Sequence, residues 1–219
     1  MKENILIIGD LHLPYTHEEY LEHCINTQQK YKTNKTIFIG DIVDNHASSY
    51  YETNPDGHSA GSELNEVKKQ INLWKRWFKK ADVCLGNHDR LIMRKAFSNG
   101  ISQQWIRGYS EVLQTPHWEF QLSFTYNNVI YLHGEGCGNL TQSIYRHRSS
   151  IVAGHFHTQF KIDFSSSEKD LLFGMNVGCG INPTMYAFEY AKYNNARPIL
   201  GCGVVLDNGK QPILCPMKM

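Results

Sequence analysis

The stretch Ala81-Asp82-Val83-Cys84-Leu85-Gly86-Asn87-His88-Asp89 decides the fold. Its first five residues are apolar except for Asp82 and predict a short buried β-strand, because the stretch is too short for a helix. A glycine and three polar residues follow at once, and their side chains can bind a metal or move a proton. In open α/β sheets, ligands collect at the carboxyl ends of the strands. The polar residues alone are also a reasonable turn sequence, so their interpretation depends on the rest of the chain.

The same order of apolar run and polar cluster occurs four more times. The runs Ile5–Ile8 and Thr36–Ile39 are followed by Gly-Asp-Leu-His at residues 9–12 and by Gly-Asp-Ile-Val-Asp at residues 40–44. The runs 129–132 and 151–153 lead into His-Gly at residues 133–134 and Gly-His-Phe-His at residues 154–157. Alternate residues of an extended chain face the same side. Asp10 and His12 are therefore placed to hold one ion together.

Helical patterns and turn residues complete the predicted element order. A helix is expected from near Thr16 to Tyr31, with Thr16 and Glu19 as a capping box. A second is expected from a Ser62 cap to Phe78, and a third over 90–97. Further strands are predicted over 120–124, 171–173 and 203–206, with a hairpin turn at 126–128.

Three further segments complete this order. The long polar loop over residues 45–61 is expected to have a function. Residues 101–118 are expected to form a helix-plus-loop flap near the site. The stretch containing Tyr186, Tyr190 and Tyr193 is expected to pack at the end of a second sheet.

Size, composition and charge predict one globular domain over residues 1–219. The 219 residues are 41% hydrophobic and 20% charged, and the formal net charge of +1 gives no overall attraction to nucleic acid or a membrane. Six cysteines include no Cys-x-x-Cys pair, and no signal peptide or transmembrane run is visible. We therefore expect a reduced, cytoplasmic protein that does not enter a membrane. The oligomeric state is left open.

The polar residues at the strand ends form a mixed set of carboxylate, imidazole and amide groups. Such donors suit Mn²⁺, Fe or Zn²⁺ better than Ca²⁺, and the absence of thiolates argues against a structural zinc site. These groups are too many to coordinate one metal ion, whereas two metal ions that share a carboxylate can be coordinated by all of them. Two-metal sites clamp in-line displacement at phosphorus. The set is Asp10, His12, Asp41, Asn87, His88, His133, His155 and His157.

These five motifs, in this order, resemble those of the calcineurin-like metallophosphoesterases. The match runs from Asp10 to His157, about two thirds of the chain. It implies an α/β fold, a four-layer α-β-β-α sandwich of two mixed β-sheets, with a dinuclear metal site at the strand ends. The compact chain resembles small, capless phosphodiesterase-like members.

The resemblance also implies roles for individual residues. Asp10, His12 and His157 hold one metal, whereas Asn87, His133 and His155 hold the other, and Asp41 bridges the two. His88 protonates the leaving oxygen or stabilises the phosphoryl charge. A nearby carboxylate would keep it protonated; Asp44 and Asp89 are the candidates, and the resemblance favours Asp44.

Substrate contacts are predicted less directly. Arg90 is a candidate phosphate clamp because its guanidinium suits bidentate contacts, and Asn87 also faces the substrate. His46 and His58 are weaker candidates, since their loop leaves the strand end that carries Asp41.

The expected activity is hydrolysis of a phosphodiester, in a nucleotide, a cyclic nucleotide or nucleic acid, by a metal-bridging hydroxide. Mn²⁺ is favoured as the metal, with Fe, Zn²⁺ and Ni²⁺ as alternatives. One alternative activity is a phosphomonoesterase, including a Ser/Thr protein phosphatase. That branch typically has Asp-Arg-Gly where this chain has Asp44-Asn45, and Glu where it has Asp89. The non-enzyme alternative is a metal-binding interaction scaffold, against which the presence of His88 argues.

Overall fold

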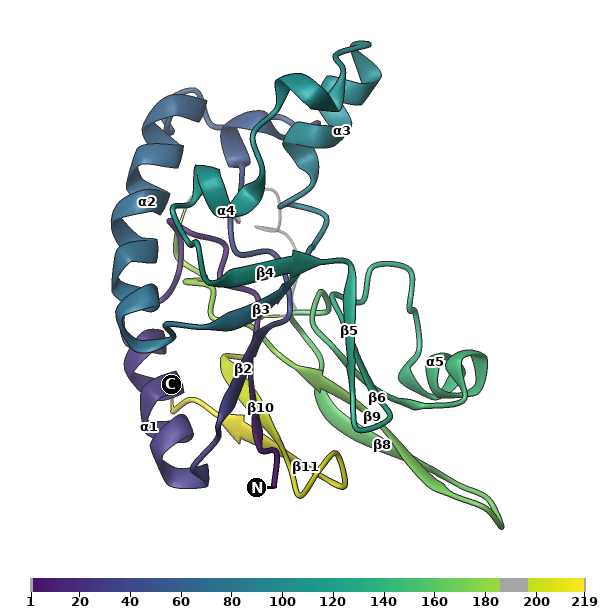
Figure 1. Ribbon diagram of the computed structural model, residues 1–219. Helices are drawn as coiled ribbons and strands as arrows, with labels where there is room; N and C mark the ends of the chain where they lie inside the picture. The colour runs from purple at the N-terminus through teal and green to yellow at the C-terminus, as the bar shows by residue number, and fades with distance from the viewer. Residues whose placement is uncertain (1, 186–196, 219) are drawn as a thin grey trace.

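The computed structural model describes residues 2–185 and 197–218. Within them, two β-sheets lie face to face and helices cover their outer surfaces (Figure 1). The predicted packing of Tyr186, Tyr190 and Tyr193 lies outside the described residues.

The first sheet is mixed and has the strand order β11-β10-β1-β2-β3-β4 in the described part of the chain. Neighbours from β1 to β4 are parallel, whereas β10 is antiparallel to both β1 and β11. The strands are β1 (Ile5–Ile8), β2 (Lys35–Phe38), β3 (Ala81–Cys84), β4 (Trp118–Gln121), β10 (Gly201–Leu206) and β11 (Gln211–Pro216).

The second sheet is also mixed, with the strand order β5-β6-β7-β9-β8. Here β6, β7 and β9 run parallel, and the edge strands β5 and β8 run antiparallel to their neighbours. The strands are β5 (Ser123–Tyr126), β6 (Val129–Leu132), β7 (Ser150–Ala153), β8 (Phe160–Ser166) and β9 (Leu171–Val177).

Helices form the two outer layers. The helices α1 (Tyr20–Tyr31) and α2 (Ala60–Trp77) cover the first sheet, and α5 (Leu140–His147) lies on the second (Figure 1). The side chains of β1 show why both faces need cover. Leu6 and Ile8 join the core under the helices, whereas Ile5 and Ile7 join the core between the sheets. The expected four-layer sandwich of two mixed sheets is confirmed.

The helix starts differ from the sequence-based prediction. The helix α1 begins at Tyr20, because the Thr16 hydroxyl donates to the Leu11 carbonyl 2.5 Å away and Glu19 makes no side-chain capping bond. The predicted capping box was therefore wrong. The helix α2 begins at Ala60, and its cap is Ser59 rather than Ser62. The Ser59 hydroxyl accepts a hydrogen bond from the Ser62 amide at 3.3 Å.

The prediction of a single strand over residues 120–124 was wrong, because this stretch belongs to two strands in different sheets. The chain leaves the first sheet after β4, passes Leu122, and enters the second sheet as β5. One continuous stretch of alternating apolar and polar residues thus supplies an edge strand to each sheet. The hairpin turn was predicted correctly, since Asn127 and Asn128 both have positive φ, 50° and 60°, between β5 and β6. The elements α5, β8 and β11 were not predicted.

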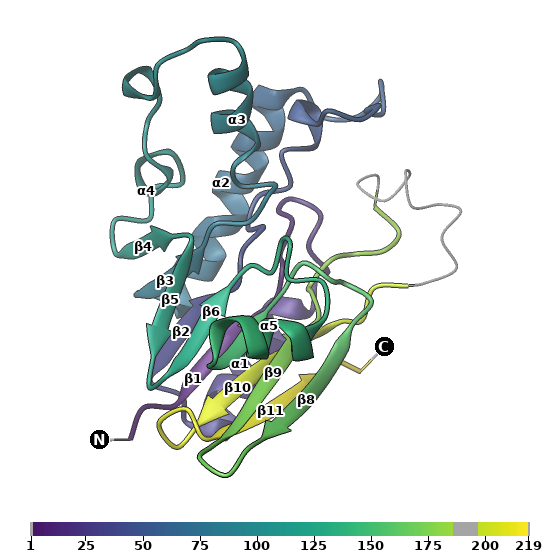
Figure 2. The same cartoon turned by 90° about the vertical axis from the view of Figure 1, so that its right-hand side faces the viewer.

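The segments after β2 and β3 lie above the sheets. Residues 46–48 form a short 3₁₀ helix, and α3 (Leu91–Ser98) follows β3. Residues 101–118 contain a second 3₁₀ helix (Gln103–Trp105) and one turn of helix, α4 (Tyr109–Val112), before β4 starts at Trp118. Figure 2 shows α3 and α4 at the end of the molecule toward which the first parallel strands run.

Tyr20 ties α1 to the first sheet. Its hydroxyl, fully buried, accepts a hydrogen bond from the Gly9 amide at 3.0 Å and donates one to the Gly201 carbonyl at 2.7 Å. We expect Tyr20→Phe to lower the free energy of unfolding by about 1–3 kcal/mol, because two buried backbone groups lose their partner. Urea denaturation measures this. Tyr145→Phe, at an exposed position on α5, is the control; equal stability of the two variants would contradict the prediction.

Candidate metal centre

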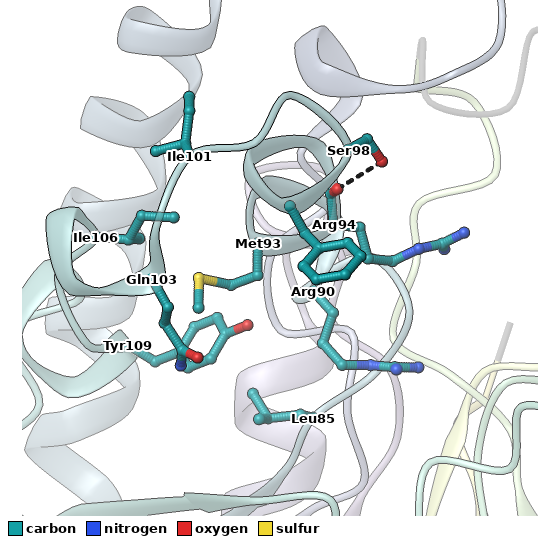
Figure 3. Close-up of a pocket in the computed structure, with 10 residues that line it drawn as sticks. Leu85, Arg90, Met93, Arg94, Ser98, Ile101, Gln103, Ile106 and Tyr109 are labelled. Carbon is teal, nitrogen blue, oxygen red and sulfur yellow. Dashed lines mark hydrogen bonds between the residues drawn. The ribbon is translucent and has the colours of Figure 1, made fainter.

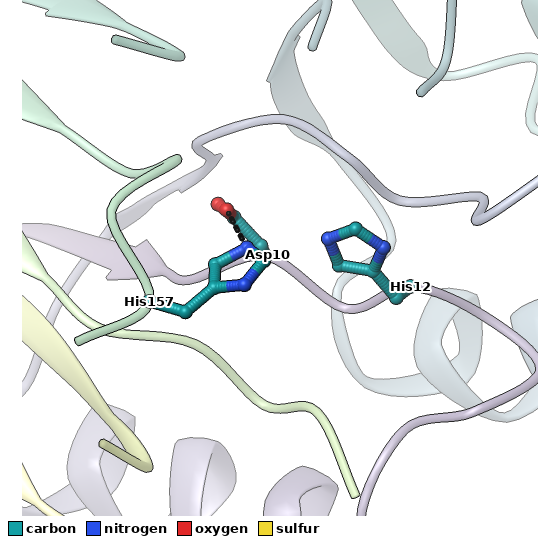
Figure 4. A group of neighbouring side chains, drawn as sticks. All are labelled: Asp10, His12 and His157. Carbon is teal, nitrogen blue, oxygen red and sulfur yellow. Dashed lines mark hydrogen bonds and ion pairs between the residues drawn. The ribbon is translucent and has the colours of Figure 1, made fainter. Parts of the chain in front are cut away.

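Asp10, His12 and His157 converge from two sheets (Figure 4). Asp10 and His12 follow β1, and His157 follows β7 of the other sheet. His157 Nε2 lies 3.0 Å from Asp10 Oδ2, and one ligand atom from each residue falls within 4.8 Å of the others. This is the first predicted ligand triad, and the structure brings it together.

A second group forms beside it from Asp41, His133 and His155. His133 Nε2 lies 3.1 Å from Asp41 Oδ2 and 3.2 Å from His155 Nδ1. The Asn87 side-chain oxygen is 3.0 Å from the same nitrogen. The predicted second ligand set thus surrounds one small volume.

Asp41 lies between the two groups. Its Oδ2 is 3.1 Å from His133 Nε2 in the second group and 3.6 Å from His12 Nε2 in the first. Its other oxygen accepts a hydrogen bond from the His88 amide at 2.8 Å. This is the position that a bridging carboxylate requires.

Three glycines of the motifs make room for ligands from other motifs. A Cβ at Gly40 would collide with the His133 ring, one at Gly86 with the Asp41 carboxylate, and one at Gly154 with Asp10. Each contact would be closer than atoms tolerate. The glycines are therefore needed because the backbone of one strand end touches the ligand of another.

The backbone is unusual at several candidate ligands. His12, Asp41 and His155 have positive φ values of 49°, 46° and 66°. Side chains other than glycine seldom adopt this region, and such residues concentrate at functional sites. Hydrogen bonds hold the conformation, since the Asp41 carbonyl accepts from the amides of Leu11 and His12.

The charges of the site suit cations. Burial alone would raise the pKa of Asp41, but the facing imidazoles of His133 and His12 hold it below its usual value. Burial also disfavours a charged His133, yet Asp41 and Asp10 raise its pKa to about 10. Asp10 Oδ1 is buried and has no hydrogen-bond partner. Two carboxylates facing several imidazoles, with one orphaned oxygen, fit divalent metal ions.

Asp44 and His88 lie beside the ligands. The Asp44 carboxylate was expected to serve His88, but its hydrogen bond is to another histidine. The Asp44 carboxylate accepts a hydrogen bond from His12 Nδ1 at 2.6 Å. The His88 Nδ1 instead faces the Asp44 main-chain carbonyl at 2.7 Å, with the carboxylate at 3.5 Å. Burial disfavours charge on His88, but Asp41 and Asp44 outweigh it and raise its pKa. One residue thus orients two histidines.

The predicted substrate contacts fall into different surroundings. Arg90 forms an ion pair with Glu135 and a 3.2 Å hydrogen bond from its Nε to the Gly86 carbonyl. His46 is buried 3.9 Å from Asp44, with its Nε2 lacking a hydrogen-bond partner. His58 is exposed on the loop, and its ring lies 3.5 Å from the Ser62 hydroxyl.

Two buried acids support the site in ways that were not predicted. The Asp89 side chain accepts hydrogen bonds from the amides of Val43 and Gly86 at 3.1 and 2.9 Å, so it joins two motifs. Its burial and the nearby Asp41 raise its pKa to about 6. Glu63 accepts from the amides of His46 and Ala47, both at 2.9 Å. No local pattern marks Glu63, which lies on α2.

Residues 3–175 match the family model for calcineurin-like phosphoesterases. The chain belongs to this family. Family membership implies bound divalent metal ions and action on phosphate esters, and the two groups of ligands agree with both. The chain has no significant match among curated protein sequences.

Solved structures agree on the fold. A metallophosphoesterase from Sphaerobacter thermophilus aligns with a TM-score of 0.54 and 13% identity, over all of this chain and 89% of the other. Vacuolar protein sorting 29 from Cryptosporidium parvum aligns with a TM-score of 0.51 and 15% identity, over 96% and 88% of the two chains. At these identities the likeness shows the fold alone.

In the described ranges, no helix has both the length and the apolar character needed to cross a lipid bilayer. All six cysteines fall within those ranges, and each is a free thiol.

The close approach of Gly86 to Asp41 makes a direct prediction. We expect Gly86→Ala to weaken divalent metal binding by about 10–100-fold, because the new methyl group displaces Asp41. Metal content after dialysis, measured by elemental analysis, tests this. Gly61→Ala is the control, since a Cβ there meets no atom within 4 Å. Full metal retention by Gly86→Ala would contradict the role of the glycine.

Proposed function

We propose that the protein is a dinuclear metal-dependent phosphodiesterase. The observation that carries the proposal is the pair of ligand groups joined at Asp41, with His88 beside them. Asp10, His12 and His157 would hold one ion. Asn87, His133 and His155 would hold the other, with Asp41 shared. When bound, the two ions would supply an activated water nucleophile and neutralise phosphate oxygens.

His88 is the proposed proton donor to the leaving oxygen. Its Nδ1 faces a main-chain carbonyl, which can only accept, so Nδ1 carries a proton. The other nitrogen, Nε2, is then the atom that gives its proton to substrate. The raised pKa of His88 favours the protonated ring that this role needs. Asp44 would position both this ring and His12.

A diester is the favoured substrate because the compact chain resembles small, capless members of the family that often act on diesters. The departures at Asn45 and Asp89 separately weaken the protein-phosphatase alternative. Asn45 donates from its side-chain amide to the His88 carbonyl at 2.9 Å, so it supports the loop of the proposed acid. Mn²⁺ is the favoured metal. We also propose a cytoplasmic location, which the six free thiols support.

Hydrolysis of two model esters tests substrate type. We expect faster Mn²⁺-dependent turnover of bis-p-nitrophenyl phosphate than of p-nitrophenyl phosphate, and loss of both activities when the metals are removed. Release of p-nitrophenol measures each rate, and added Mn²⁺ should restore it. Preference for the monoester would favour the phosphomonoesterase alternative instead.

Replacement of His88 separates an enzyme from a metal-binding scaffold. We expect His88→Ala to lower kcat for the preferred ester by about 10²–10⁴-fold, the usual contribution of a general acid, while metal content is retained. His117→Ala, at an exposed histidine before β4, is the matched control. An absence of turnover in the native protein with both metals bound would favour the scaffold.

A further inference from the structure

A cavity of about 460 Å³ lies between α3 and residues 101–109 (Figure 3). Most of its wall is apolar or aromatic, and one of its residues, Leu85, directly precedes Gly86 of the metal motif. The apolar and aromatic lining residues are Leu85, Met93, Phe97, Ile101, Ile106 and Tyr109.

A few polar groups interrupt this wall. Arg90, Arg94 and the Gln103 amide line the same cavity. Arg94 also lies over the ring of Tyr50, 5.6 Å from its centroid. Apolar walls with a small number of placed polar groups are typical of small-molecule sites of this volume. Because the Arg94 guanidinium packs on Tyr50, which does not line the cavity, Arg90 is the cation that suits the cavity to an anionic ligand.

The cavity adjoins a second cavity that reaches a candidate metal ligand. A second cavity of about 350 Å³ shares Leu85 and Arg90 with the first and is lined in turn by the metal-ligand candidate His133. Arg90 therefore stands at the junction of the two. Its partner Glu135 is 44% exposed, and exposed ion pairs contribute little stability. The guanidinium can exchange this carboxylate for a substrate phosphate at small cost.

We propose that this cavity binds a nucleoside of the substrate, with its base against Phe97 and Tyr109 and the adjoining phosphate at Arg90. This proposal rests on the proposed phosphodiesterase function and narrows the substrate class to nucleotide phosphodiesters. A base is flat and apolar on its faces, polar at its edge, and joined to an anion. Aromatic walls, the Gln103 amide and Arg90 match these three properties in turn. An alkyl chain would use the apolar walls alone.

Methionine methyl groups report binding without catalysis. In protein loaded with diamagnetic Zn²⁺ and labelled at its methionine methyls, deoxyadenosine 5′-monophosphate should shift the NMR signal of Met93, which lines the cavity. The signal of Met175, in the core between the sheets, should stay in place. Methyl phosphate, which lacks the nucleoside, should leave Met93 unchanged. Equal effects of the two ligands on Met93, or none, would overturn the proposal.

Phe97 supplies the matched variants because its side chain is 86% exposed, so its loss should not disturb folding. We expect Phe97→Ala to weaken nucleotide binding about tenfold, within the range for loss of a base–aromatic stack. Gln103→Ala should weaken it as well. Phe164→Ala, an exposed phenylalanine on β8, is the control and should bind like the native protein. Native affinity in Phe97→Ala would overturn the placement of the base.

The two proposals fail in different ways. Hydrolysis of bis-p-nitrophenyl phosphate without a nucleotide-specific shift of Met93 would reject the nucleoside site and leave the phosphodiesterase standing. A nucleotide-specific shift without hydrolysis would support the site and reject the activity.

Discussion

The close contact between motif glycines and ligands from other strands is the constraint on which the rest of the structure depends. Gly86 touches the Asp41 carboxylate, and Gly154 touches Asp10. These pairs link strand ends within the first sheet and across to the second. The strand ends can approach this closely only because both faces of the central strands are packed. The positions of the metal ligands and the packing of the two sheets are thus coupled, so a displacement of the strands displaces the ligands.

Buried carboxylates outside the ligand set hold the intervening loops in place. Asp89 accepts hydrogen bonds from backbone amides of the segments after β2 and β3. Glu63 of α2 accepts hydrogen bonds from the amides of His46 and Ala47. Asp44 orients His12 with its carboxylate and His88 with its main-chain carbonyl. These hydrogen bonds satisfy backbone groups of the loops that would otherwise be unpaired. They therefore fix the positions of ligands on loops as closely as those of ligands on strands.

The sequence predicted the central strands and the convergence of their polar ends, since short apolar runs followed by Gly and metal-binding residues are a local signal. Prediction from the sequence failed where the local structure depends on contacts between residues far apart in the chain. The strand over residues 120–124 divides at Leu122 because its two halves find partners in different sheets. The edge strand β8 has a mostly part-exposed pattern and lacks an apolar run. The carboxylate of Asp44 faces His12 rather than serving His88 alone, and only the folded backbone decides between the two.

The position of β1 in its sheet has a consequence for synthesis of the chain. Ile5 pairs with Lys35 on one side and with Val205 on the other. The ribosome synthesises the chain from its amino terminus, so the β10 side of β1 stays unpaired until residues 201–206 have emerged. Every candidate metal ligand, from Asp10 to His157, has left the ribosome before β10 does. The nascent chain therefore carries all of its candidate ligands beside an open strand edge, and such an edge can pair with another chain until β10 covers it.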